Sequence, residues 1–247
     1  MAGHIIEIPW GAEKAVYTTA FGGREPFLGQ WGMTPDGRMF RWAFSGGAIG
    51  AGQRVESAPT VAADDMDLAV AAAAAVGATT ISVTTAGAIA LNLYQDGYIY
   101  VNDVDGEGHL YCIRSHPAAA NAATLVLTLH ETVREALTVN SQAGLIRNKY
   151  KDVVIGAAGS NVGATVGVAP TEVTDDDYFW CQVAGYTAGL AEDPAWVVGD
   201  GLEIGVDVAG AFQLHDVSAE TDKRPLGESV AIVPVAGDYG IMDLHIW

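Results

Sequence analysis

Large apolar residues alternate with polar residues in short runs along the middle of the chain. The clearest example lies between Tyr94 and Ile113, where alternating runs at 98–101 and 110–113 flank a polar turn at 103–108 that contains two glycines. Alternation with a period of two places successive side chains on opposite faces of a strand. A polar break with glycine between two such runs is typical of a β-hairpin. The sequence therefore predicts a hairpin here, and no long window has an apolar stripe with the period of a helix.

Further short strands are predicted on both sides of this hairpin. Ile81 and Val83 share one face of the run at 77–84, and three leucines share one face of the run at 123–129. Such runs recur every 10 to 20 residues and are separated by Gly, Asp and Pro, which favour turns. A further strand is predicted to start near 136–139, and the remaining predicted strands lie at 178–183, 201–206, 211–214, 229–234 and 241–247.

The alanine-rich stretch at 69–78 admits two interpretations. Its alanine content favours a helix, but Leu68 and Val70 alternate and Gly77 follows closely, so we expect a strand or irregular structure. The stretch is too short and too weakly apolar to span a bilayer. The N-terminus also lacks the basic region and apolar core of a signal peptide. We therefore expect a soluble protein that is made in the cytoplasm and does not bind membranes.

Breaks in the strand pattern divide the chain into three parts. Residues 1–60 are rich in glycine and aromatic residues and predict an extended N-terminal arm with one short hairpin. Residues 61–155 and 156–247 each hold strands at spacings typical of a small β-barrel or β-sandwich. The glycine-rich stretch at 156–167 is predicted to be a linker, because it lacks the Gly-Lys-Ser/Thr ending of a phosphate-binding loop. The predicted fold class is all-β, with two small β-barrel or β-sandwich domains after the arm.

The aromatic residues of the N-terminal segment are the candidate interface positions. This segment holds eight of the 21 aromatic residues and 11 of the 30 glycines, and Asp36-Gly37 marks its predicted hairpin. Large rings separated by Gly and Pro do not close a compact core by themselves, but they can fill pockets on another surface. Two arrangements are open: edge strands that pack on the chain's own body, or an arm that reaches a neighbouring subunit. The candidates are Trp10, Tyr17, Phe21, Phe27, Trp31, Phe40, Trp42 and Phe44.

Charge is distributed unevenly along the chain. The formal net charge is −18, from 12 basic and 30 acidic residues. Residues 1–60 are neutral, residues 61–155 carry a net charge of −5 and residues 156–247 a net charge of −13. Binding to nucleic acid depends on Lys and Arg that displace counterions from phosphates. The sequence therefore excludes nucleic acid as a partner.

No group of residues in the sequence has the pattern of a reaction centre. The six histidines are scattered without a metal-ligand spacing, and no serine lies in a Gly-x-Ser-x-Gly turn. Carboxylates that are distant in sequence can still meet in space, as in glycosidases. Among 30 acidic residues, however, such a pair cannot be distinguished from a solvated surface. We expect no enzyme, no catalytic residue and no cofactor.

Two acidic clusters and two cysteines complete the candidate chemistry. Asp103 and Asp105 resemble the start of a calcium loop but lack its further ligands, and the acidic run 175–177 precedes an aromatic strand. Turn formation explains both clusters without a metal, although calcium stays an alternative. Cys112 and Cys181 each lie in an apolar run, which favours two buried thiols over a disulfide.

Several phrases of the sequence resemble those of a group of phage proteins. The chain from about residue 61 onward is similar to capsid decoration and cement proteins of tailed phages from aquatic environments. The resemblance lies in the order of short phrases rather than in one diagnostic motif. These phrases include Gly-Ala-Thr-Thr-Ile-Ser-Val-Thr at 77–84, Tyr-Ile-Tyr-Val-Asn-Asp at 98–103, Thr-Leu-Val-Leu-Thr-Leu at 124–129, Asn-Lys-Tyr-Lys-Asp-Val-Val at 148–154 and Gly-Ala-Thr-Val-Gly-Val-Ala-Pro at 163–170.

The resemblance implies a structural protein of the virion without catalytic residues. Such a protein binds the lattice of the major capsid protein on the outer surface of the head and stabilises it. We expect a homo-oligomer, with a trimer favoured, because the lattice is symmetric. The aromatic segment at 1–60 departs from compact decoration proteins and leaves the position on the particle open. Two alternatives are another virion component, such as a tail, fibre or head–tail protein, and a carbohydrate-binding module or enzyme with exposed aromatics on a sheet face.

Overall fold

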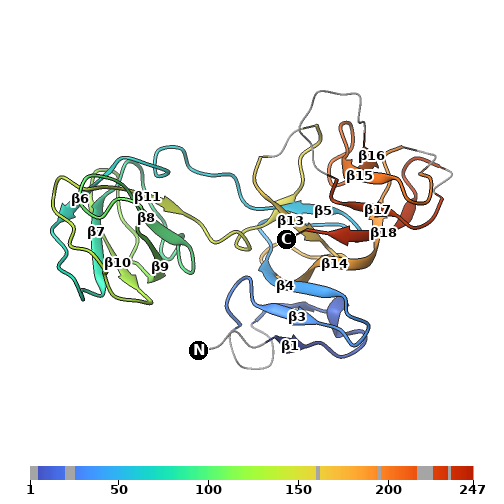
Figure 1. The fold of residues 1–247 in the computed structure, drawn as a ribbon, viewed down its shortest axis with the longest axis horizontal. Coiled ribbons are helices and arrows are strands. Elements are labelled where there is room, and N and C mark those ends of the chain that lie inside the picture. Colours follow the sequence, from blue (N-terminus) through green and yellow to red (C-terminus); the bar gives the residue numbers. More distant parts are fainter. Residues whose placement is uncertain are drawn as a thin grey trace. The chain divides into compact units, whose positions relative to one another are not determined.

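The computed structural model describes residues 5–19, 26–159, 162–193, 196–215, 225–232 and 235–246. These residues form 18 strands and one 3₁₀ turn, η1 (Ala12–Lys14), so the predicted all-β fold class is confirmed (Figure 1). In this part of the chain, no helix has the length and apolar character needed to cross a membrane.

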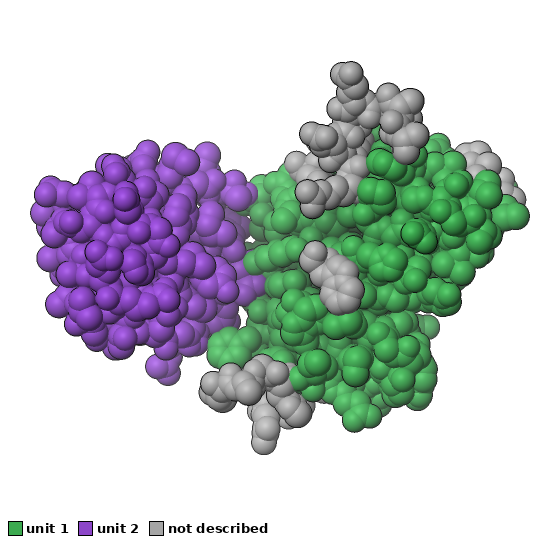
Figure 2. Space-filling view, viewed as in Figure 1, with its two compact units in different colours: residues 1–59, 149–247 green, residues 60–148 purple. Residues whose placement is uncertain are grey.

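The chain forms two compact units, which differ from the three predicted segments. A barrel unit comprises residues 60–148, and a larger unit combines residues 1–59 with 149–247 (Figure 2). The first predicted domain therefore corresponds closely to the barrel unit. The second predicted domain is not independent, because its strands share one sheet with strands of the N-terminal segment. The barrel unit is thus an insertion between two stretches that fold together.

Six antiparallel strands close the barrel in the order β10-β7-β6-β11-β8-β9, with β9 also paired to β10. Inward and outward side chains alternate along each strand, and the inward ones form one apolar core that includes Tyr94, Ile99 and Leu127. The strands are β6 (Leu68–Ala72), β7 (Thr80–Thr84), β8 (Tyr98–Asp103), β9 (Leu110–Ser115), β10 (Thr124–Leu129) and β11 (Gln142–Ile146).

Most strand predictions for the barrel unit are confirmed. The predicted hairpin is β8 and β9, with Ile99 opposite Tyr111. The alanine-rich stretch begins as strand β6, as its alternating start indicated. The strand predicted to start near 136–139 begins later, as β11 at Gln142, and Leu137 makes only an isolated bridge to Ala74. Gly144 in β11 hid the position of that strand in the sequence pattern, because glycine is rare in strand interiors.

The larger unit contains one 12-stranded sheet in which the long strand β14 (Tyr178–Leu190) is central. The path runs β1-β3-β4-β14-β18-β17-β15-β16, and β2, β5, β12 and β13 join it at the side. The other strands are β1 (Ile6–Glu7), β2 (Val16–Tyr17), β3 (Trp31–Met33), β4 (Met39–Phe44), β5 (Arg54–Glu56), β12 (Val154–Ile155), β13 (Thr165–Val168), β15 (Gly201–Ile204), β16 (Phe212–Leu214), β17 (Gly227–Ser229) and β18 (Tyr239–His245).

Strand β14 changes partners along its length. Its first half pairs with β4, its second half pairs with β18, and the register shifts between Gln182 and Ala184. Gly185 has φ of 84° at this irregularity, a conformation that glycine adopts without steric cost. The buried side-chain amide of Gln182 donates to the carbonyls of Ala184, Gly185 and Tyr186 at 2.9–3.2 Å. These bonds satisfy carbonyl groups that the irregularity removes from the ladder.

The N-terminal segment is not an extended arm in this structure. Its predicted hairpin is present as β3 and β4, with Met33 opposite Met39, and β4 pairs along the first half of β14. Trp42 lies opposite Trp180, with ring centroids 4.9 Å apart. The aromatic side chains therefore close a core together with strands that lie far away in sequence. Of the two open arrangements, packing on the chain's own body is the one observed.

The glycine-rich stretch at 156–167 is not a linker between the units, because the chain passes from one unit to the other at 59/60 and at 148/149. It folds over an ion pair of β5 between Arg54 and Glu56, both fully buried. Arg54 Nη2 donates to the carbonyl of Ala157 at 2.8 Å, and Glu56 Oε2 accepts from the amide of Val162 at 2.9 Å. A Cβ at Gly156 would collide with the Arg54 guanidinium, so glycine is required by close packing.

Candidate functional site

The eight candidate interface aromatics have different surroundings in the structure. Phe40 and Trp42 are fully buried in the core of the larger unit. Tyr17 packs 5.3 Å from the Trp42 ring, and Phe44 packs 4.7 Å from the ring of Tyr178. Phe40 and Trp42 therefore stabilise the fold of their own unit and are not accessible anchors, while Tyr17 and Phe44 are half-buried against neighbouring rings.

The remaining candidates are closer to the surface. The Arg41 guanidinium lies 3.2 Å from the ring centroid of Trp31, which is half-buried. Trp10 is 64% exposed and Phe27 is about half exposed. Phe21 lies outside the described residues. The structure therefore leaves Trp10 and Phe27 as exposed aromatic side chains of the predicted set.

Exposed apolar residues gather next to the edge strand β1. Ile5 and Met33 are both exposed, and they line one hollow of about 260 Å³ together with Glu7, Thr34, Pro35 and Gly37. Trp10 is also exposed, and its ring centroid lies 5.9 Å from the guanidinium of Arg38, which follows Gly37 in the chain. We call Ile5, Trp10 and Met33 the N-terminal apolar face. Its position follows from the short parallel pairing of β1 with β3, which places Glu7 opposite Met33 at the end of the sheet path.

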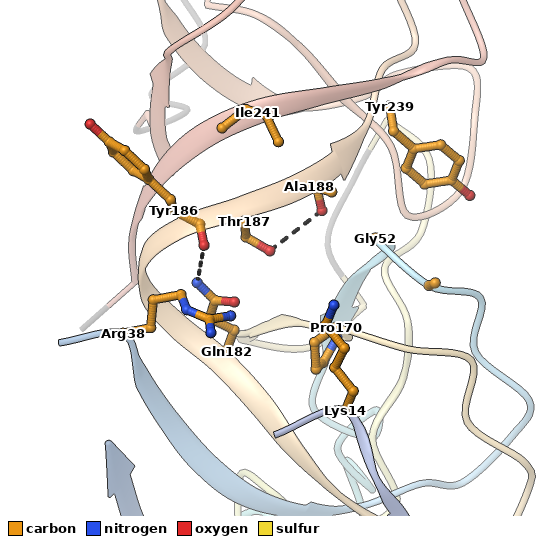
Figure 3. Close-up of a pocket in the computed structure, with 11 residues that line it drawn as sticks. Lys14, Arg38, Gly52, Pro170, Gln182, Tyr186, Thr187, Ala188, Tyr239 and Ile241 are labelled. Atoms are coloured by element: carbon orange, nitrogen blue, oxygen red, sulfur yellow. Dashed lines mark hydrogen bonds between the residues drawn. The ribbon is translucent and has the colours of Figure 1, made fainter. Parts of the chain in front are cut away.

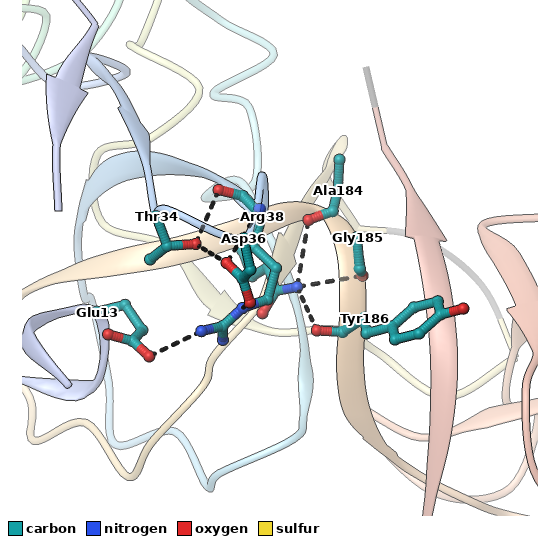
Figure 4. Close-up of polar contacts among 8 residues, drawn as sticks. Glu13, Thr34, Asp36, Arg38, Ala184, Gly185 and Tyr186 are labelled. Carbon is teal, nitrogen blue, oxygen red and sulfur yellow. Dashed lines mark hydrogen bonds and ion pairs between the residues drawn. The ribbon is translucent and has the colours of Figure 1, made fainter. Parts of the chain in front are cut away.

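Arg38 connects this face to the rest of the larger unit through a polar network (Figure 4). Its Nη2 donates to Glu13 at 2.9 Å and its Nε donates to Asp36 at 2.7 Å. Burial acts to raise the pKa of Asp36, but hydrogen bonds from Thr34 and Arg38 outweigh it, so the pKa lies below its ordinary value. The guanidinium also lies 5.9 Å from the Trp10 ring centroid. The charge of Arg38 is therefore balanced by two carboxylates, and its side chain is held in place.

A second hollow, of about 370 Å³, lies over β14 and β18 (Figure 3). We call it the tyrosine hollow, because Tyr186 is 60% exposed and Tyr239 is 56% exposed at its rim. Figure 3 shows the two tyrosines on opposite sides, with Arg38, Lys14 and Pro170 below them. The residues that line it are Lys14, Arg38, Ala51, Gly52, Pro170, Gln182, Tyr186, Thr187, Ala188, Tyr239 and Ile241.

Strand register explains why these side chains share one face. Ala188 lies opposite Ile241, and Tyr239 lies opposite Leu190 in the same antiparallel pair. Tyr239 and Ile241 are exposed, while Met242 and Leu244 on β18 are buried in the core. The sequence analysis missed this site, because the run from Ala184 to Leu190 contains two glycines and does not resemble a strand. The alternation of Tyr239 and Ile241 is the signal in the sequence that could have indicated it.

The tyrosine hollow has the chemistry of a binding site. Its described lining contains no carboxylate, histidine or cysteine. What it offers is two phenol rings, aliphatic side chains and the donors of Lys14 and Arg38. This combination of apolar walls with a few polar groups is typical of ligand sites.

The acidic clusters have roles in turns. Asp103 Oδ1 accepts from the amide of Val104 at 2.9 Å, and Asp105 Oδ2 accepts from the Thr138 hydroxyl at 2.8 Å. Asp177 accepts with its carbonyl from the amide of Ser45 at 2.9 Å. Within the described ranges, no group of three or more His, Cys, Asp or Glu side chains is arranged to hold a metal ion. Neither cluster shows the ligand set that calcium requires.

Cys112 and Cys181 are free thiols, the first half-buried and the second fully buried. Burial raises the pKa of Cys112 to about 11, and Asp96 and Glu131 add to the shift. Burial also raises the pKa of Cys181. Both thiols are therefore protonated and unreactive near neutral pH.

No protein-family model matches the chain, and the comparisons with curated proteins and with solved structures find no match either. The function proposed below is therefore argued from the sequence, the fold and the two hollows described above.

Proposed function

We propose that the chain is a non-enzymatic structural protein of a tailed-phage virion, which binds the outer capsid lattice as a decoration protein. The observation that carries the proposal is the N-terminal apolar face, in which Trp10 is 64% exposed and Ile5 and Met33 are exposed as well. Exposed tryptophans and neighbouring aliphatic residues are frequent anchors of protein interfaces. The phage assignment itself comes from the resemblance of the sequence.

The architecture supports a binding role on a crowded surface. Both units consist of strands, and both are acidic: the barrel unit carries a net charge of −6 and the larger unit −12. Such charge keeps a densely covered particle soluble and repels stray nucleic acid. A face that is apolar and rimmed by few charges can bind a protein lattice while the remaining surface stays hydrated.

Binding of a homo-oligomer to a symmetric capsid lattice multiplies the affinity of each single contact. A capsid lattice presents the same site many times, and a homo-oligomer of the chain, with a trimer favoured, engages several sites at once. A modest affinity for each site is then sufficient for a stable coat. The mass of the purified protein in solution, measured by sedimentation equilibrium, tests the trimer.

Co-sedimentation with capsid shells tests the lattice proposal. Shells assembled from the major capsid protein of a phage that carries this gene are mixed with the full chain at increasing concentration. We expect saturable binding, lost in Trp10→Ala and kept in Leu91→Ala, a matched control on an exposed apolar residue of the barrel unit. If the wild-type chain does not bind shells, the decoration role is overturned. Equal binding of the two variants overturns the assignment of the face.

A further inference from the structure

We propose that the tyrosine hollow binds a neutral saccharide, a function beyond the proposed role in the capsid. The first observation is the packing of the Tyr239 ring against the backbone of Gly52. A Cβ at Gly52 would lie 2.7 Å from Cε1 and 2.8 Å from Cδ1 of the Tyr239 ring, so the ring packs directly against the glycine backbone. The ring is nevertheless 56% exposed. One side of the ring is therefore held by the protein and the other is open to a ligand.

Saccharides bind to aromatic rings of this kind. The face of an aromatic ring carries partial negative charge and attracts the polarised C–H groups that cover one side of a pyranose ring. A ring that is fixed on a rigid sheet loses little conformational entropy when a sugar stacks on it. The Tyr239 ring, which packs against Gly52, meets this condition, and Tyr186 lies on the neighbouring strand β14.

The two tyrosines define a site for more than one sugar unit. They lie on opposite sides of the hollow in Figure 3, with Ala188 and Ile241 between them on neighbouring strands. The volume of about 370 Å³ is within the range of small-ligand sites. The hollow therefore has room for a short saccharide segment.

The polar groups of the hollow select hydroxyls over charged groups. Lys14 is exposed and, among the described residues, has no ion-pair partner, so its ammonium group can donate to sugar hydroxyls. Arg38 is already paired with Glu13 and Asp36. The chain carries a net charge of −18, and its field repels polyanions. A neutral saccharide is therefore favoured over an acidic one.

Affinity electrophoresis tests this assignment with the full chain. Native gels contain dextran, mannan, galactomannan or xyloglucan, and an alginate gel serves as the acidic counterpart. We expect at least one neutral polysaccharide to retard the protein. Tyr239→Ala and Tyr186→Ala should each weaken the retardation about tenfold. Tyr239→Phe, which keeps the ring, should retain it, as should Tyr98→Ala, a control on another exposed tyrosine.

Several outcomes overturn the proposal. These are the absence of retardation in every neutral gel, retardation of Tyr239→Ala equal to that of the wild type, and salt-sensitive retardation in alginate alone. If the two tyrosine variants instead lose binding to capsid shells while no saccharide retards the chain, the hollow is a protein-docking site. Failure of shell binding by Trp10→Ala leaves this test unaffected, so the two proposals fail separately.

Discussion

The ring of Tyr239 lies against the backbone of Gly52, so closely that no side chain fits between them. Gly52 also has φ of 70°, a left-handed conformation that other residues adopt only with strain. The contact joins strand β18 to the turn before β5, and it fixes one wall of the tyrosine hollow. Glycine is therefore required twice at this position, by the backbone angle and by the ring.

Gly52→Ala is expected to lower the free energy of unfolding of the larger unit by about 1–2 kcal/mol, from backbone strain and displacement of the ring. Tryptophan fluorescence in a urea titration measures this unit alone, because all six tryptophans of the chain lie in it. Gly37→Ala is the matched control, since Gly37 has φ of 85° but no atom lies within 4 Å of the position that a Cβ would take there. Equal losses in the two variants would mean that the ring contact contributes nothing.

Val104→Gly is expected to stabilise the barrel unit by about 1 kcal/mol. Val104 is a β-branched residue at φ of 65° in the turn between β8 and β9, where a left-handed backbone costs energy that glycine avoids. Hydrogen exchange of amides in β8 and β9, followed by mass spectrometry, reports the change. Val126→Gly is the control, because Val126 has the same 44% exposure but an extended backbone in β10. Stabilisation by both variants, or by neither, contradicts the strain at Val104.

Glu56→Gln is expected to lower the free energy of unfolding of the larger unit by about 3 kcal/mol. The change leaves the buried Arg54 charge without its counter-charge, which costs far more than the loss of a surface ion pair. It also places an amide where a carboxylate oxygen now accepts from Val162 and Gly163. Urea titration followed by tryptophan fluorescence gives the value. Glu228→Gln on β17, which is exposed, should change it by less than about 0.5 kcal/mol.

Alkylation of Cys112 by iodoacetamide near pH 8 is expected to be about 100-fold slower than that of an unfolded thiol. A pKa of about 11 leaves far less thiolate than the ordinary value of about 9. Because the folded pKa is raised, its contribution to stability is complete below about pH 9 and is lost as the pH rises toward 11. Mass spectrometry of the labelled protein at pH 8 and pH 11 measures both thiols.

Denatured protein provides the control for this labelling. In urea both cysteines should react at the ordinary rate of a thiol, while Cys181 in the folded chain should stay unlabelled at pH 8 because it is fully buried. Rapid labelling of Cys112 in the native protein at this pH would show that its environment is more exposed and less apolar than the structure indicates.

Local patterns made the barrel unit predictable. Leu125, Leu127 and Leu129 alternate within one strand, and their burial follows from that alternation alone. The β8–β9 hairpin is equally local, since its two strands are joined by one turn. The start of β11 was placed too early, because Gly144 interrupts its apolar run.

The sheet of the larger unit could not be predicted, because its pairings are distant in sequence. Trp42 meets Trp180, and the hydroxyl of Ser45 donates to the carbonyl of Thr174 across a separation of 129 residues. Nothing in the N-terminal segment reveals such partners, so Phe40 and Trp42 were interpreted as anchors when they are core. Trp10 is exposed in the structure and stays a candidate interface residue. Tyr186 and Tyr239 were missed, since their shared face exists only once β14 and β18 are paired.

The insertion of the barrel unit also fixes the order in which the chain can mature on the ribosome. All strands of the barrel unit are synthesised before any of β12 to β18. Until β14 emerges, Trp42 and Phe40 lack the strand that covers them, and the nascent N-terminal segment presents them to chaperones. Arrested nascent chains that end before and after β14 should therefore differ in protease resistance in the N-terminal segment and be alike in the barrel unit.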